Sequence, residues 1–121
     1  MNLLALDIGL KRTGVSFCND SDCVVVSLET IKHNGFDELL AALKQIMKDK
    51  SVDSVVLGYP LLLSGEGGEQ CEIVIAFSKL LEELEIPYSF VDERFTSNSD
   101  ALDKDASAAV SILSTYLELK S

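Results

Sequence analysis

The spacing of apolar residues along the chain predicts an α/β protein. Apolar runs rich in β-branched residues alternate with stretches in which apolar residues recur every three or four positions. The expected strands are Asn2–Ile8, Thr13–Asn19, Cys23–Thr30, Asp53–Tyr59 and Pro87–Asp92, and the expected helices are Phe36–Lys50, Glu69–Glu85 and Asp103–Leu119. The short connections between the first three strands predict an antiparallel meander.

The chain is expected to form one domain over residues 1–121. Its 121 residues are 47% hydrophobic, which is enough for a sizeable core. Without an apolar run of about 18 residues or a basic leader, we expect a soluble, cytoplasmic protein. Three cysteines, Cys18, Cys23 and Cys71, match no zinc pattern, and the sole histidine, His33, stands alone in a polar turn. We therefore expect buried, reduced thiols.

The net charge of −10 argues against a protein that binds a nucleic acid duplex through a broad basic face. Contact with nucleic acid would have to be local, at basic residues such as Lys11, Arg12 and Arg94. The alternative is an acidic protein whose surface carboxylates keep it dispersed in solution.

A carboxylate, Asp7, stands at the end of the first predicted strand. It is followed by a basic turn between glycines, Gly9-Leu10-Lys11-Arg12-Thr13-Gly14. This combination suits metal-assisted phosphate chemistry. A tight hairpin with glycines at its turn positions would give the same pattern.

Two later segments add carboxylates. The fifth strand ends in Asp92-Glu93-Arg94, and successive strand side chains point to opposite faces, so the two acids are not expected to share a role. Arg94 could simply pair with one of them. In the last helix, Asp105 is in line with Ala109 and Ile112, on the face expected to pack on the sheet. A favourable interaction of Asp105 with the helix dipole is the competing explanation.

Four motifs together resemble the YqgF/RuvX family of Holliday-junction-resolvase-like nucleases, proposed to process the 5′ end of pre-16S ribosomal RNA. The resemblance covers nearly the whole chain. The matching positions are Asp7, Gly9, Lys11, Gly14 and Val15, then Val56, Gly58, Pro60 and Leu61, then Asp92, Glu93, Arg94 and Thr96, and finally the helix that starts Asp105-Ala-Ser-Ala-Ala-Val. The chain departs from the family in two places. The loop after Pro60 has Leu62 and Ser64 where the family usually has an Asn and an Asp, and the 97–104 segment is shorter than usual.

The resemblance implies a ribonuclease-H-like fold, with a five-stranded mixed sheet and helices on both faces. It also implies that Asp7, Glu93 and Asp105 converge as catalytic residues and hold one or two Mg²⁺ or Mn²⁺ ions, with Asp92 as the substitute for Glu93. Lys11, Arg12, Arg94 and Thr96 would bind the substrate. Hard cations of this kind prefer oxygen ligands.

The partner implied by the resemblance is nucleic acid, either a pre-rRNA in ribosomal precursor particles or branched DNA. The motifs do not distinguish RNA from DNA, or a monomer from a homodimer. A catalytically silent ribosome-assembly or nucleic-acid-binding module is the main alternative. The actin/Hsp70/sugar-kinase superfamily also opens with an Asp-x-Gly turn, but its two-lobed ATP cleft does not fit in 121 residues.

Overall fold

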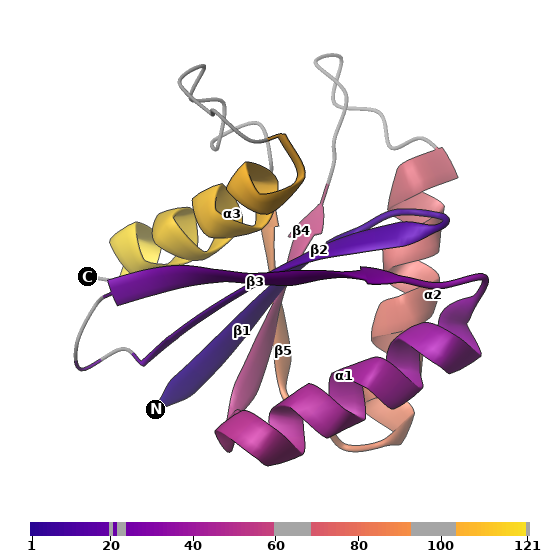
Figure 1. Ribbon diagram of the computed structural model, residues 1–121, viewed down its shortest axis with the longest axis horizontal. Coiled ribbons are helices and arrows are strands. Elements are labelled where there is room, and N and C mark those ends of the chain that lie inside the picture. Colours follow the sequence, from indigo (N-terminus) through magenta and orange to yellow (C-terminus); the bar gives the residue numbers. More distant parts are fainter. Residues whose placement is uncertain (20, 22–23, 60–68, 93–103, 121) are drawn as a thin grey trace.

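The protein is a five-stranded sheet with helices on both faces (Figure 1). The computed structural model describes residues 1–19, 21, 24–59, 69–92 and 104–120, with the side chains at 69–70, 92, 104–107 and 120 outside the description. The strands are β1 (Asn2–Ile8), β2 (Arg12–Asn19), β3 (Val24–Lys32), β4 (Ser54–Tyr59) and β5 (Tyr88–Asp92). The helices are α1 (Phe36–Lys50), α2 (Glu69–Glu83) and α3 (Lys104–Lys120).

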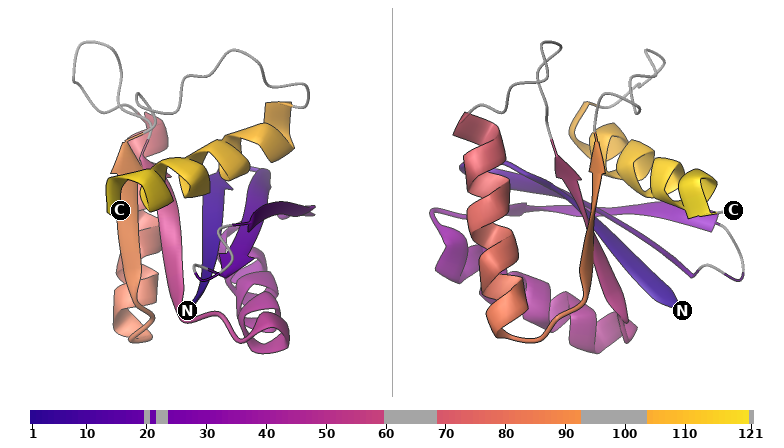
Figure 2. Two further views of the ribbon diagram at one scale, coloured as in Figure 1. Left: turned by 90° about the vertical axis from the view of Figure 1, so that its left-hand side faces the viewer. Right: turned by 180° about the vertical axis from the view of Figure 1, so that it is seen from behind.

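β1 is the central strand. The strand order is β3-β2-β1-β4-β5, in which β2 pairs antiparallel with β1 and β3, while β4 pairs parallel with β1 and β5. The predicted meander and mixed sheet are therefore confirmed. Because β1, β4 and β5 run in the same direction, their carboxyl ends lie at one edge, where sites in α/β sheets commonly form. Figure 2 shows the arrowheads of β4 and β5 at this edge together with the first turn of α3.

The alternation of side chains along β1 divides the core into two layers. Leu4, Leu6 and Ile8 pack in the layer formed with α1 and α2, whereas Leu3 and Ala5 pack in the layer formed with α3. The left panel of Figure 2 shows α3 across one face and the other two helices behind the sheet. Any later residue of β1 that continues the Leu3–Ala5 series lies on the α3 face.

α1 has the predicted bounds and the predicted apolar stripe. Leu39 and Leu43 are fully buried, and the remaining stripe residues pack around them. The helix ends at Ser51, which adopts the left-handed conformation (φ 51°, ψ 50°). Its backbone is held there by a hydrogen bond from the Val52 N–H to the Met47 carbonyl of 2.9 Å.

α2 ends earlier than predicted. The apolar spacing predicts a helix to Glu85, but the helix ends at Glu83 because Glu85 takes a positive φ of 59°. The Ile86 N–H then donates to the Leu81 carbonyl over 2.9 Å, which closes the helix end.

The remaining predictions agree with the described residues to within two positions at each element end. The centre of β4 is fully buried, as expected for a strand covered on both faces. Cys18 and Cys71 are buried thiols outside any disulfide, while Cys23 and residues 60–68 lie outside the described residues. No helix in the described part of the chain is long and apolar enough to span a membrane.

Candidate active site around Asp7

Asp7 lies on the α3 face of the central strand. It continues the series Leu3, Ala5 along β1, and in the antiparallel ladder it pairs with Gly14 of β2. Because Gly14 has no side chain, the partly buried Asp7 carboxylate borders open space. This space is a hollow of about 420 Å³, which is lined by Asp7, Gly14, Thr30 and the turn from Ile8 to Arg12. We call it the Asp7 hollow.

The basic turn after Asp7 is tightly folded. A Cβ atom at Gly9 would lie 2.6 Å from the Arg12 carbonyl oxygen, so only glycine leaves room for this close approach. The turn presents Lys11 and Arg12, both exposed, at the rim of the Asp7 hollow. A carboxylate and two cations thus border one cavity, and the cations can neutralise the charge of a phosphate group there.

His33, which directly follows β3, anchors this turn. The side chain is only 4% exposed. Its backbone N–H donates to the Lys11 carbonyl over 2.9 Å, and its ring Nε2 lies 2.8 Å from the buried Thr13 hydroxyl. Burial lowers the pKa of His33 below the ordinary value of 6.5, although the Glu38 carboxylate opposes that shift. These contacts could not be predicted from the sequence, because nothing near His33 in the chain indicates its distant partners.

α3 brings its amino-terminal end to the same edge of the sheet. The Ser16 hydroxyl of β2 donates to the Ala109 carbonyl of α3 over 2.7 Å. Ala109 and Ile112 are fully buried, and Tyr116 packs against the buried cluster that contains Ile112, which confirms the predicted packing face from position 109 onward. Asp105, one turn before Ala109, is the second residue of α3.

The remaining predicted site residues lie largely outside the described structure. Glu93, Arg94 and Thr96 are not described, and neither is the side chain of Asp105 or of Asp92. Leu62, Ser64 and the 97–103 part of the shortened segment are not described either. The described side chains contain no group of three potential metal ligands. Since two of the three predicted ligands are not among them, the convergence of Asp7, Glu93 and Asp105 stays a prediction.

Comparison with known proteins gives a consistent assignment. The family model "RuvX: Holliday junction resolvase" matches residues 1–119. A protein of Caldanaerobacter subterraneus subsp. tengcongensis is 41% identical over 98 residues, 80% of this chain and 70% of the relative. A protein of Dictyoglomus thermophilum is 31% identical over 136 residues, 100% of this chain and 98% of the relative. Both bear the name "Putative pre-16S rRNA nuclease".

The fold comparison agrees with the sequence comparison. The structure of Thermus thermophilus RuvC in complex with a Holliday junction substrate superposes with a TM-score of 0.72 at 10% identity, covering 99% of this chain and 95% of that one. At this identity the likeness shows the fold alone, and it confirms the predicted ribonuclease-H-like architecture. Because the family model spans almost the whole sequence and both relatives exceed 30% identity, the chain belongs to the RuvX family of Holliday-junction-resolvase-like nucleases.

Proposed function

We propose that the protein is a metal-dependent endonuclease of structured nucleic acid, and that it processes the 5′ end of pre-16S rRNA in the cytoplasm. The observation that carries the proposal is the position of Asp7, at the end of the central strand in a hollow rimmed by Lys11 and Arg12. The names of the relatives favour the ribosomal substrate.

The chemistry of the donor set fits a divalent cation. Asp7 is a partly buried carboxylate at an open hollow, and oxygen ligands of this kind suit Mg²⁺ or Mn²⁺. We assign Glu93 and Asp105 as the further ligands. Asp105 is in the first turn of α3, and the next turn of this helix is hydrogen-bonded to β2 through the Ala109 carbonyl. Glu93 comes two positions after Val91, which packs in the α3 layer.

The bound ion would activate water and stabilise the leaving oxygen of the phosphodiester. The chain's own part is to position the substrate. Lys11 and Arg12 draw the phosphate into the Asp7 hollow, and the closely packed turn at Gly9 keeps these cations beside Asp7. Arg94 and Thr96 are assigned as further substrate contacts from the family motif.

The test is Asp7→Asn, which removes one charge and keeps the shape of the side chain. We expect Mg²⁺-dependent cleavage of a pre-16S 5′ leader RNA to fall below detection, while the melting temperature stays near that of the parent. Asp37→Asn, at an exposed position in the first turn of α1, is the matched control and should cleave normally. Normal cleavage by Asp7→Asn would overturn the proposal, and severe unfolding would identify Asp7 as a structural residue instead.

A second candidate substrate is a four-way DNA junction, because the matching family model is described as a Holliday junction resolvase. Assaying both substrates in parallel separates the candidates. Binding of either substrate without cleavage of any would favour the silent assembly module.

A further inference from the structure

A second hollow lies on the other side of the basic turn. It has a volume of about 430 Å³ and is lined by Lys11, Arg12, Lys32, His33, Asn34 and Glu38. We call it the Lys32 hollow. It shares Lys11 and Arg12 with the Asp7 hollow, and its other lining residues run from the end of β3 to the first turn of α1. The basic turn therefore forms a common wall between two cavities.

The Lys32 hollow carries a local excess of positive charge. Three of its lining side chains are cations, and all three are exposed, whereas Glu38 is its one carboxylate. Oε2 of Glu38 already accepts a hydrogen bond from the Asn34 N–H over 3.1 Å. In a chain whose net charge is −10, such a concentration of cations attracts anions to this corner in preference to the rest of the surface.

Hydrogen bonds of His33 hold the wall of the Lys32 hollow in place. His33 bonds to the backbone of Lys11 and to the Thr13 side chain, so the basic turn and the end of β3 are tied together. Its other ring nitrogen, Nδ1, is buried and has no hydrogen-bond partner. Because this atom is shielded from solvent, the affinity of the hollow for anions comes from its exposed cations, and His33 serves to hold the wall in place.

We propose that the Lys32 hollow is a second phosphate-binding site, which holds a neighbouring backbone phosphate of the same nucleic acid strand whose scissile phosphate lies in the Asp7 hollow. The proposal rests on the nuclease function proposed above. It adds a contact by which the bound nucleic acid would continue past the basic turn to the end of β3 and the start of α1. Lysine and arginine contacts to phosphate position a strand without reading its bases. The site should thus contribute affinity for RNA and DNA alike.

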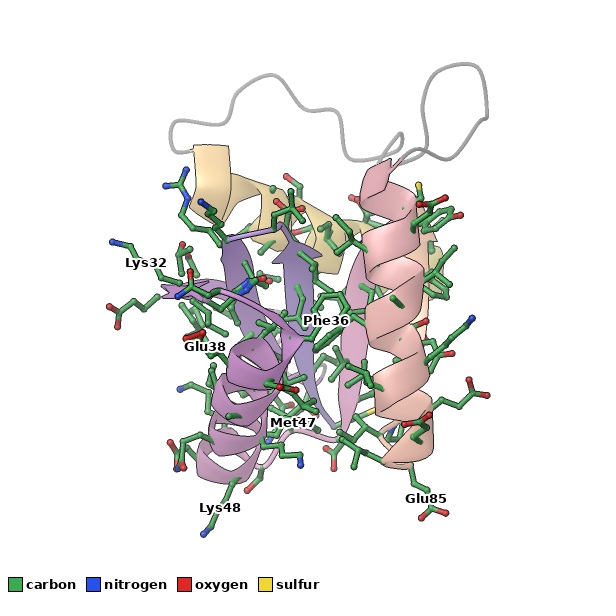
Figure 3. All side chains as sticks on the ribbon, turned by 90° about the vertical axis from the view of Figure 1, so that its right-hand side faces the viewer. Lys32, Phe36, Glu38, Met47, Lys48 and Glu85 are labelled. Atoms are coloured by element: carbon green, nitrogen blue, oxygen red, sulfur yellow. The ribbon has the colours of Figure 1, made fainter. Side chains whose placement is uncertain are left out.

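The chain offers variants that move affinity in opposite directions. Figure 3 shows Lys32 and Glu38 near the amino-terminal end of α1, and Lys48 at the opposite end of that helix. Lys32→Gln removes a cation from the hollow, and Glu38→Gln removes its carboxylate while keeping an oxygen for the Asn34 N–H. Lys48→Gln makes the same charge change as Lys32→Gln at an exposed position away from both hollows.

The experiment measures binding of a fluorescent pre-16S leader RNA by anisotropy, with EDTA present to prevent cleavage. At about 50 mM salt we expect Lys32→Gln to weaken binding roughly three- to tenfold and to make the log–log salt slope about one unit shallower. Glu38→Gln should tighten binding by about two- to fivefold, which a merely misfolded variant would not do. Lys48→Gln should bind as the parent does.

The ring of His33 gives a second readout because it is the chain's sole imidazole and lines the hollow. Its ¹⁵N signals should shift when the RNA is added to the parent protein, and less in Lys32→Gln. A shift with inorganic phosphate but none with RNA would overturn the proposal, since the anion site would then not be used by a strand. Equal affinities of Lys32→Gln and Lys48→Gln would also overturn it.

The two proposals fail in different ways. If Asp7→Asn cleaves normally, the nuclease assignment of Asp7 is wrong, whatever the Lys32 variants do. If the parent cleaves RNA but Lys32→Gln binds unchanged, only the second phosphate site is wrong. If the parent binds neither RNA nor DNA at low salt, both are overturned.

Discussion

At the scale of single residues, two glycines differ in whether the fold leaves room for a side chain. Gly9 lies in the basic turn, where a Cβ would meet the backbone oxygen of Arg12 at 2.6 Å, while a Cβ at Gly35, before α1, would meet nothing within 4 Å. Gly35 has extended backbone angles (φ 177°, ψ 178°) that other residues also adopt. Comparing a glycine-to-alanine substitution at the two sites therefore separates the effect of crowding in the basic turn from the general effect of replacing a glycine.

We expect Gly9→Ala to lower the free energy of unfolding by about 1–3 kcal/mol, because the backbone must shift to relieve the contact with Arg12. It should also weaken nucleic acid binding, since Lys11 and Arg12 would move with the turn. Gly35→Ala should leave both nearly unchanged. Urea unfolding of the two variants checks this, and equal midpoints would show that the turn accommodates a side chain at position 9.

At the scale of secondary-structure elements, two side-chain hydrogen bonds connect β2 to α3 on one side and to the residue after β3 on the other. Ser16 of β2 bonds to α3 through the Ala109 carbonyl, and Thr13 of the same strand bonds to His33 at the end of β3. Both contacts are buried and far apart in sequence. Positions along β2 thus set where α3 begins relative to Asp7 and how the basic turn lies relative to α1.

The His33 contact predicts a pH dependence of stability. Because burial lowers its pKa in the folded state below 6.5, the unfolded chain binds a proton more readily. The His33 contribution to stability should be fully present above pH 6.5 and should decline as the pH falls below that value, by at most about 1.4 kcal/mol per pH unit.

Chemical unfolding at pH 5.5 and 7.5 measures this effect. His33→Gln should lower stability at pH 7.5 but should lose less between the two pH values than the parent does. An identical loss in the parent and in His33→Gln would assign the pH dependence to other groups.

At the scale of the whole molecule, a net charge of −10 is combined with a small basic corner among the described residues. The excess of acidic groups repels nucleic acid, so we expect binding to depend on few contacts. With Lys11, Arg12, Lys32 and Arg94 as phosphate contacts, log affinity should fall with log salt with a slope of about −3 to −4. Anisotropy titrations over a salt series measure the slope, and a value near −8 would mean that a larger binding surface lies elsewhere.

The sequence by itself determined the order and nature of the elements, because the period of apolar residues along each segment is a local property. β1 and α1 have the predicted bounds, and the buried centre of β4 follows from its run of apolar residues. The sequence also identified Asp7 as a candidate site residue, because a carboxylate between an apolar strand and a glycine-containing turn is a local pattern. The end of α2 was not predicted because the left-handed residue there is Glu85, whereas this conformation is usually indicated in a sequence by a glycine.

Only the tertiary structure decided which face of the sheet Asp7 occupies and what surrounds it. The open space beside Asp7 arises because the ladder places Gly14 opposite, seven residues along the chain, and the burial of His33 arises from Thr13 and Lys11, twenty or more positions away. In the sequence Lys32 lies beyond the predicted strand Cys23–Thr30 and belongs to no motif, whereas in the structure it ends β3 and lines a charged cavity with the basic turn and α1. Such contacts depend on strand pairing and helix packing across the fold, which the local spacing of apolar and polar residues does not contain.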